Sequence, residues 1–350
     1  MGVDMANGTA MKNLIVVHGT DRTQCGFQRF VLPTLMHATS LTENVRVELR
    51  TSPVTDVGEL KRLISVVIVR PADIAWKGYV AYYTQKRQFF GFKVVVDFDD
   101  PLWCVHDNCR ELMDDVHRGF DCAVLSTRAL KDKFHDRYPA TRAIVMPNGV
   151  ADFMYGNTET ADCSARPRNV PVVLYGGAGG HDDDFAGPWT PWLRHKVEDG
   201  EIEFHCFASP VKPLEHLANR ITVHGAVTPP EWGKALTAIR PDFYIAPLAD
   251  TTVNRCKSDL KYKEACELGA VFIGCGESWS PYRSAPKAQL VSNSDTEDEL
   301  DAKFRTLCEP ENFANAVKAQ RDMLTEKHFR MTDHVFIGRW LIAYGNCKEA

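Results

Sequence analysis

Three aspartates stand close together at the end of an apolar run in the first half of the chain. Residues 93–98 read KVVVDF, and Asp97, Asp99 and Asp100 lie at or just after the end of this run. We interpret the run as a buried strand, so these carboxylates should face the sheet edge where parallel sheets bind ligands. Like charges this close should raise the pKa of one carboxyl group, which suits a proton acceptor. Two alternatives stay open: hydrogen bonding that only supports the fold, and a divalent metal site.

A basic segment in the second half has the residue types of an anion site. A predicted strand is followed by a polar loop with Asn254, Arg255 and Lys257, and a helix should begin near Ser258. Serine is a favoured N-cap residue, and fixed cations beside free helix amides attract anions strongly. Glu264, about two turns into this helix, could accept hydrogen bonds from both hydroxyls of a ribose. The plainer interpretation is a solvated basic loop with an ordinary surface glutamate.

A glycine-rich turn follows the strand that opens the second half. Residues 175–184 read YGGAGGHDDD, and glycines there would let the backbone approach a ligand closely. Exposed amides in such a turn could cradle a diphosphate. The spacing of Gly176, Gly177, Gly179 and Gly180 differs from G-x-G-x-x-G, so an NAD-binding domain is disfavoured.

Single histidines also stand where predicted strands end. His18 ends the first apolar run and His181 follows the glycine-rich turn, so each could contact phosphate or take part in catalysis. A lone histidine is more often structural. Three tryptophans could stack on a sugar or a base, although core packing is the more common role; they are Trp103, Trp189 and Trp192.

Short apolar runs alternate with longer amphipathic stretches along the whole chain. The runs are apolar at nearly every position, which is typical of strands covered on both faces in a parallel α/β sheet. The predicted strands are residues 13–18, 63–69, 93–98, 122–126, 143–146, 172–175, 202–207, 221–224, 243–245 and 271–273. The predicted helices are residues 27–37, 76–90, 230–239, 260–268 and 334–344.

This order of elements predicts two Rossmann-like domains that face a central cleft. A polar stretch without periodicity, residues 151–170, is the expected linker. It separates an N-terminal domain, residues 1–150, from a C-terminal domain, residues 171–329. The last segment, residues 330–350, is expected to pack back on the first domain. A parallel sheet binds ligands at the carboxyl ends of its strands, so two such domains across a cleft would suit a transfer between two substrates.

Composition sets the broad class. The 350 residues are 25% charged and 44% hydrophobic, which excludes disorder, collagen and coiled coil as descriptions of the whole chain. The formal charge of −5 divides into +2 for residues 1–150 and −7 for the rest, unlike a protein that binds nucleic acid mainly through phosphates. Eleven irregularly spaced cysteines, no signal-peptide pattern and no apolar run of membrane-spanning length predict a reduced, cytoplasmic protein without stable membrane insertion.

Several motifs taken together resemble those of GT-B glycosyltransferases of the group 1, family 4-like type. Asn254, Lys257-Ser258 and Glu264, five residues before Gly269, resemble the donor-binding pattern N-x-x-K-S followed by E-x-x-x-x-G. The E-x-seven-E variety is not matched, because Cys256 stands where its first glutamate would be. Further pieces resemble the family in the same order, over roughly residues 13–275: residues 26–33 (GFQRFVLP), 146–150 (MPNGV) and 221–227 (ITVHGAV).

The resemblance implies a GT-B fold and transfer of a hexose or pentose from a nucleotide-diphosphate sugar, such as a UDP-sugar, to an acceptor hydroxyl. It implies neither a metal nor any cofactor beyond this co-substrate. The residues expected on the catalytic or acceptor side are Asp97, Asp99, Asp100 and His181. The residues expected to bind the donor are Gly19, Gly177, Gly179, His224, Asn254, Arg255, Lys257, Ser258, Lys261 and Glu264.

The acceptor stays open at this point. A glycan, lipid-linked or protein acceptor is possible for a bacterial member. A phage-encoded member could instead modify a hydroxymethylated DNA base in the host cytoplasm. A protein that binds nucleotide-sugars without catalysis is the alternative from a different class.

Overall fold

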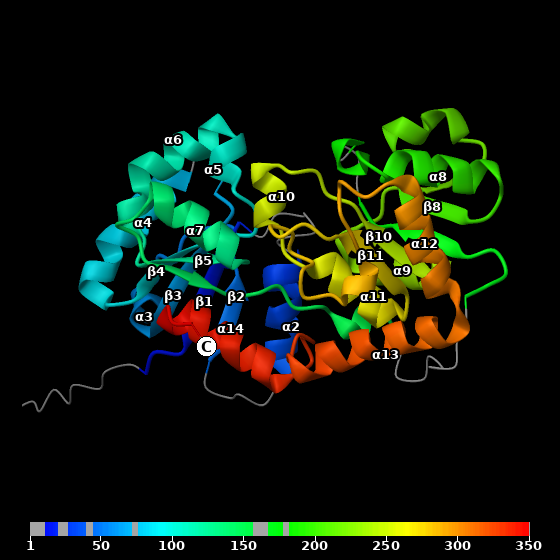
Figure 1. The fold of residues 1–350 in the computed structure, drawn as a ribbon. Coiled ribbons are helices and arrows are strands. Elements are labelled where there is room, and N and C mark those ends of the chain that lie inside the picture. Colours follow the sequence, from blue (N-terminus) through cyan, green and yellow to red (C-terminus); the bar gives the residue numbers. More distant parts are fainter. Residues whose placement is uncertain are drawn as a thin grey trace, which may run out of the picture. The chain divides into compact units, whose positions relative to one another are not determined.

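The computed structural model describes residues 11–19, 27–39, 45–71, 76–156, 167–177 and 182–349. The chain divides into two compact units (Figure 1). The first consists of Met1–Pro147 and Ile337–Ala350, and the second of Asn148–Phe336. Each unit contains, within the described residues, a parallel six-stranded sheet, so the expected α/β class with two Rossmann-like sheets is confirmed.

The first sheet has the strand order β2-β1-β3-β4-β5-β6. Its strands are β1 (Leu14–His18), β2 (Arg46–Leu49), β3 (Leu63–Val69), β4 (Lys93–Phe98), β5 (Cys122–Leu125) and β6 (Ala143–Val145). Every residue of β1 and β5 is buried, as is all of β4 after its first residue. Strands apolar at every position are therefore covered on both faces here.

Two helices around the first sheet, α3 and α7, begin at a polar side chain that caps them. Asp56 accepts a hydrogen bond from the Glu59 amide, and Thr127 accepts one from the Leu130 amide. The helices are η1 (Phe27–Val31), α2 (Leu32–Thr39), α3 (Val57–Arg62), α4 (Trp76–Phe90), α5 (Leu102–Val105), α6 (Asp107–Val116), η2 (His117–Gly119) and α7 (Arg128–Arg137).

The last helix, α14 (His334–Asn346), contributes its C-terminal part to the first unit. The rings of Trp340 and Tyr344 lie 6.1 Å and 5.1 Å from the ring of Phe30. The Trp340 indole also donates a hydrogen bond to the Arg29 carbonyl oxygen at 3.0 Å. The apolar face of the C-terminal part of α14 therefore packs into the core of the first unit.

The second sheet has the order β12-β11-β10-β7-β8-β9. Its strands are β7 (Val172–Tyr175), β8 (Glu203–Phe207), β9 (Thr222–His224), β10 (Phe243–Ala246), β11 (Val271–Cys275) and β12 (Leu290–Val291). Numbered from its own first strand, this is the Rossmann order 3-2-1-4-5-6, with the direction of winding reversed between β7 and β10.

Both faces of the second sheet are covered by helices. Val173 and Ile245 point into one buried cluster with Trp189 of α8, whereas Leu174 and Tyr244 point into another with side chains of α9 and α11. The helices are η3 (Asp152–Met154), η5 (Asp182–Phe185), α8 (Trp189–Glu198), η6 (Lys212–Leu217), η7 (Pro229–Glu231), α9 (Trp232–Ile239), α10 (Thr252–Cys256), α11 (Leu260–Leu268), η8 (Lys287–Gln289), α12 (Glu297–Cys308) and α13 (Pro310–Glu326).

The described part of the expected linker, residues 151–156, includes buried residues. Ala151 and Tyr155 are buried, and Asp152 begins the short helix η3. Residues 157–166 of that segment lie outside the described residues. Among the described helices, none is long and apolar enough to span a bilayer.

Candidate functional site

The candidate site lies at the carboxyl edge of the second sheet, where β7 and β10 are neighbours. From β7 the chain winds toward β8 and β9, and from β10 it winds the opposite way toward β11 and β12. Open α/β sheets bind ligands outside the strand ends at such a reversal. Tyr175 ends β7 and Ala246 ends β10, so the segments that follow these residues form the candidate site.

The segment after β10 was expected to be a polar loop. This expectation is wrong, because the segment contains a short helix, α10. Thr251 caps α10 by accepting a hydrogen bond from the Asn254 amide. The Asn254 side chain is buried and donates to Asp184 at 2.6 Å and to the Ala249 carbonyl at 3.0 Å. The same Asp184 oxygen accepts from the Ala249 amide, so Asn254 ties the segments after β7 and β10 together.

Ser258 does not act as the N-cap of the following helix. Helix α11 begins at Leu260, and Asp259 occupies its N-cap position. The Ser258 hydroxyl instead accepts a hydrogen bond from the Asn148 side-chain amide at 2.9 Å. Gly269, the last residue of the E-x-x-x-x-G pattern, ends α11 with φ of 68°, a conformation that glycine adopts most easily.

The cations of this segment differ in whether a carboxylate already neutralises them. Arg255 is half-exposed and forms a bidentate ion pair with Asp250, at 2.6 Å and 2.8 Å. Lys263 is buried and forms an ion pair with Asp259 at 2.8 Å. Lys257, by contrast with Lys263, is only partly buried.

Lys261 has no carboxylate within ion-pair distance among the described residues. Its ammonium nitrogen lies 4.4 Å from the centre of the Tyr175 ring, and the side chain is partly accessible. Burial, and next the nearby charge of Lys257, lower the pKa of Lys261 to about 8. Asp184 and Glu264 act in the opposite direction. Among the described residues, no carboxylate thus neutralises this ammonium.

Glu264 is buried, with 3% of its surface exposed, and its carboxylate is already hydrogen-bonded. Oε1 accepts from the Trp232 indole at 2.9 Å and from the Tyr155 hydroxyl at 3.3 Å, and Oε2 accepts from the Tyr244 hydroxyl at 2.8 Å. Burial raises the pKa of Glu264, and these donors act against that rise. Each carboxylate oxygen can accept two hydrogen bonds, so Oε2 keeps capacity for one more donor.

Two glycines of the glycine-rich turn make room for aromatic side chains of the protein itself. A Cβ at Gly176 would lie 1.9 Å from the Tyr244 hydroxyl, and one at Gly177 would lie 2.5 Å from the Tyr175 hydroxyl. Packing alone therefore explains glycine at both positions. Gly179 and His181 lie outside the described residues.

His224 continues an aromatic row along the same edge. Nε2 of His224 and Nδ1 of His205 are hydrogen-bonded at 3.0 Å, and the His224 ring lies 5.0 Å from that of Phe207. The Phe207 ring lies 4.8 Å from the Trp232 ring, whose indole donates to Glu264. Burial lowers the pKa of both histidines, which favours their neutral forms. Tyr175, Tyr244 and Trp232 are not identifiable as site residues from the sequence pattern, because aromatic residues beside strands indicate core packing first.

At the first sheet, the corresponding edge follows β1 and β3. A Cβ at Gly19 would lie 2.6 Å from the Val69 carbonyl oxygen, and its φ is 78°, so only glycine fits. Nδ1–H of His18 donates to the Arg50 carbonyl at 2.9 Å, which leaves Nε2 to accept from the Tyr83 hydroxyl at 2.8 Å. Both nitrogens of a neutral ring are thereby satisfied, and burial lowers the pKa of His18 to about 4.

The expectation that all three aspartates face an open edge is wrong for Asp97. This residue is 0% exposed, and its carboxylate accepts two hydrogen bonds from Arg29, at 2.9 Å and 2.5 Å, and one from the Tyr344 hydroxyl at 2.6 Å. Burial raises the pKa of Asp97, with Arg29 acting in the opposite direction. The neighbouring Asp99 charge adds little, so burial and not like-charge repulsion is the main cause.

Asp99 and Asp100 lie nearer the surface and share one arginine. Asp99 is 7% exposed and accepts a hydrogen bond from Arg70 at 2.9 Å, whereas Asp100 is 28% exposed and 3.9 Å from the same Arg70 nitrogen. In the part of the chain that the structure describes, no group of three or more His, Cys, Asp or Glu side chains is arranged to hold a metal ion.

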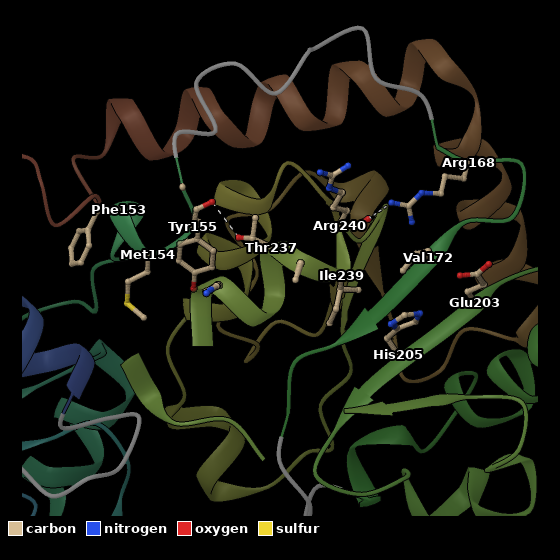
Figure 2. A pocket seen from close by; sticks show the side chains of 13 residues that line it. Phe153, Met154, Tyr155, Arg168, Val172, Glu203, His205, Thr237, Ile239 and Arg240 are labelled. Atoms are coloured by element: carbon tan, nitrogen blue, oxygen red, sulfur yellow. Dashed lines mark hydrogen bonds between the residues drawn. The ribbon is translucent and has the colours of Figure 1, made fainter. Parts of the chain in front are cut away.

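A separate hollow of about 940 Å³ lies at the opposite, amino edge of the second sheet. Val172 and Glu203, the first residues of β7 and β8, line it together with the end of α9. Figure 2 shows Arg168 and Arg240 side by side at this hollow, with Arg168 donating to the Arg240 carbonyl at 2.8 Å. Cations at the carboxyl end of a helix balance its dipole, so their presence there needs no ligand.

Two parallel six-stranded α/β sheets in tandem define a GT-B-like fold, and solved structures of glycosyltransferases match nearly the whole chain. A glycosyltransferase from Rickettsia africae ESF-5 has a TM-score of 0.63 at 12% identity, covering 96% of this chain and 98% of its own. Sucrose-phosphate synthase from Thermosynechococcus elongatus has a TM-score of 0.60 at 12% identity, covering 96% and 99%.

The HepE protein of Anabaena, solved in complex with UDP-glucose, has a TM-score of 0.59 at 11% identity, covering 95% of this chain and 99% of its own. Likeness at this level of identity establishes the fold. No protein-family model matches the chain, and no curated protein matches it in sequence.

Proposed function

We propose that the chain is a glycosyltransferase that transfers a sugar from a nucleotide-diphosphate sugar to an acceptor hydroxyl. The observation that carries the proposal is Lys261, whose ammonium has no carboxylate partner among the described residues at the strand reversal of the second sheet. The order of motifs along the sequence supports it. So does the fold shared with glycosyltransferases, one of them solved with UDP-glucose.

In this proposal the second unit binds the donor. Lys261 and Lys257 balance the diphosphate and stabilise the charge that develops on it as the glycosidic bond breaks, without a metal ion. Glu264 Oε2 accepts a ribose hydroxyl. The other proposed donor contacts are Gly19, Gly177, Gly179, His224, Asn254, Arg255 and Ser258.

The first unit is proposed to hold the acceptor. Asp100, the most exposed of its three aspartates, meets the acceptor hydroxyl, while Arg70 fixes Asp99 beside it. Asp97 supports this strand end from within the core. His181 remains a further proposed catalytic residue. Neither the fold nor the matched structures supports a modified DNA base as acceptor.

A thermal-shift screen against nucleotide-sugars and free nucleotides tests the proposal. A ligand present at 100 times its Kd should add about 2.7 kcal/mol to the free energy of unfolding. Lys261→Ala should reduce the shift, whereas Lys234→Ala at the amino-edge hollow should keep it. Slow hydrolysis of the stabilising nucleotide-sugar would separate a transferase from a protein that only binds it. A screen in which no nucleotide stabilises the protein would contradict the proposal.

A further inference from the structure

Tyr175 carries a buried hydroxyl group without a hydrogen-bond partner. Only 3% of the residue is exposed, and none of the described residues bonds to its hydroxyl oxygen. Burial raises the pKa of the phenol, so the group stays protonated and can donate. Buried polar groups are nearly always paired in folded proteins, so this one calls for an explanation.

The position of the Tyr175 ring is fixed on two sides. The Phe185 ring packs against it edge to face, with 4.8 Å between the centres. On the other side, the hydroxyl lies against the backbone of Gly177, where any Cβ would be 2.5 Å away. The phenol is therefore held at the start of the glycine-rich turn, at the strand reversal of the second sheet.

The same ring also holds Lys261. Its ammonium nitrogen lies 4.4 Å from the ring centre, within the range in which an aromatic face attracts a cation. Among the described residues, the charged groups that act on this ammonium are Lys257, Asp184 and Glu264, and neither of the two carboxylates is close enough to form an ion pair. Tyr175 thus carries a hydroxyl without a partner and also contacts an ammonium that has no carboxylate partner among the described residues.

We propose that Tyr175 is a donor-binding residue of this protein. Its ring seats the Lys261 ammonium, and its hydroxyl donates a hydrogen bond to a phosphate oxygen of a nucleoside diphosphate. This inference rests on the proposed function, because it adds a specific contact to the donor site. The ligand chemistry follows from the groups present: an anion for the ammonium, and an oxygen acceptor for the phenol.

The hydroxyl is tested by calorimetric titration with UDP, GDP, ADP, CDP and dTDP, using the one that binds most tightly. Tyr175→Phe keeps the ring and should raise Kd about tenfold or more, because a hydrogen bond to a charged oxygen is lost. Tyr262→Phe on α11 is the matched control. Tyr262 is also buried, and its ring centre lies 5.1 Å from that of Phe272. The Kd of this variant for the nucleoside diphosphate should equal that of the wild-type protein.

The possible failures can be told apart. Equal Kd values for the wild-type protein and Tyr175→Phe would overturn this inference and leave the proposed function standing. A wild-type protein that binds none of the five nucleoside diphosphates would overturn the proposed function and this inference with it. Circular dichroism and Tm of each variant confirm that the compared proteins are folded.

The contact between the Tyr175 ring and the Lys261 ammonium is tested by measuring the Kd for the same nucleoside diphosphate between pH 6.5 and 9.5. The wild-type affinity should fall as pH rises through about 8, where Lys261 loses its proton. Lys261→Arg should remove this dependence, because arginine stays charged. Tyr175→Phe should keep the wild-type midpoint, whereas Tyr175→Leu should move it to lower pH by removing the ring. An identical midpoint in both Tyr175 variants would show that the ring does not seat the ammonium.

Discussion

The carboxyl edges of the two sheets differ in how their charged groups are paired. At the first sheet, Asp97 is enclosed by Arg29 and Tyr344, and Asp99 is bonded to Arg70. At the second sheet, Lys261 rests on an aromatic ring without a carboxylate partner in the described chain. At the first edge, the charged side chains mainly stabilise the fold, whereas at the second edge the ammonium of Lys261 is available to a ligand. The two edges therefore differ more in whether their charged side chains form ion pairs than in the types of residue present.

The largest effect should come from breaking the buried pair at the first edge. Asp97→Asn leaves the buried Arg29 guanidinium without a counter-charge and should lower the free energy of unfolding by about 3–5 kcal/mol. Urea denaturation followed by circular dichroism measures this. Asp114→Asn, which breaks the exposed pair with Arg137, is the control and should cost less than about 1 kcal/mol. Similar losses in both variants would remove the distinction between the edges.

The second prediction concerns His18, a buried residue of the first edge whose two ring nitrogens are both hydrogen-bonded. Its pKa of about 4 lies below the value of 6.5 in the unfolded chain, so between these pH values the unfolded state binds more protons. Stability should therefore be complete above pH 6.5 and fall by about 3 kcal/mol as the pH drops to 4. His18→Gln, which cannot titrate, should flatten the profile by that amount. If the free energy of unfolding falls equally with pH in both proteins, the lowered pKa of His18 would be contradicted.

The third prediction separates the phosphate and ribose parts of the second edge. Glu264→Gln removes the carboxylate proposed to accept a ribose hydroxyl, so binding of UDP should weaken by about 1.5–3 kcal/mol. Binding of inorganic pyrophosphate should stay the same, because it has no ribose. Lys261→Ala should weaken both ligands. Unchanged UDP affinity in a folded Glu264→Gln protein would assign that carboxylate to the support of Tyr244 and Trp232 alone.

The smallest expected effect is that of chelation. If Lys261 and Lys257 supply the positive charge for the diphosphate, EDTA should leave the Kd for UDP unchanged. Titrations in EDTA and in added Mn²⁺ measure the difference. A loss of affinity in EDTA that Mn²⁺ restores would place a metal ion at the donor site.

Much of the fold follows from short-range pattern. Strands β3, β4 and β7 and helices α4 and α11 lie at the predicted residues, because short continuous apolar runs bounded by polar or turn residues mark strands that are covered on both faces, and the longer stretches between them mark helices. Strand β2, with the sequence RVEL, was missed because a short edge strand with alternating charges lacks that signal. Helix α8 was missed because Pro191 suggests a break, although the first turn of a helix tolerates proline.

The candidate site was predictable in residue type but not in pairing. Glu264 could be singled out from its spacing to Gly269, and the glycine-rich turn from its composition, whereas Lys261 was expected only from the family resemblance. Whether a charge is neutralised depends on residues far along the chain: Asp97 meets Arg29 and Tyr344 across 68 and 247 positions. Local sequence does not determine such contacts, and so Asp97 resembled an accessible carboxylate.

Hydrogen exchange with and without UDP, followed by mass spectrometry, tests the central claim most directly. A ligand that binds at an edge slows amide exchange in the segments that contact it. We expect protection in peptides from residues 172–184 and 246–269 of the wild-type protein, and none in those from residues 66–71. Protection confined to the first edge, or to residues 234–240 at the amino-edge hollow, would contradict it.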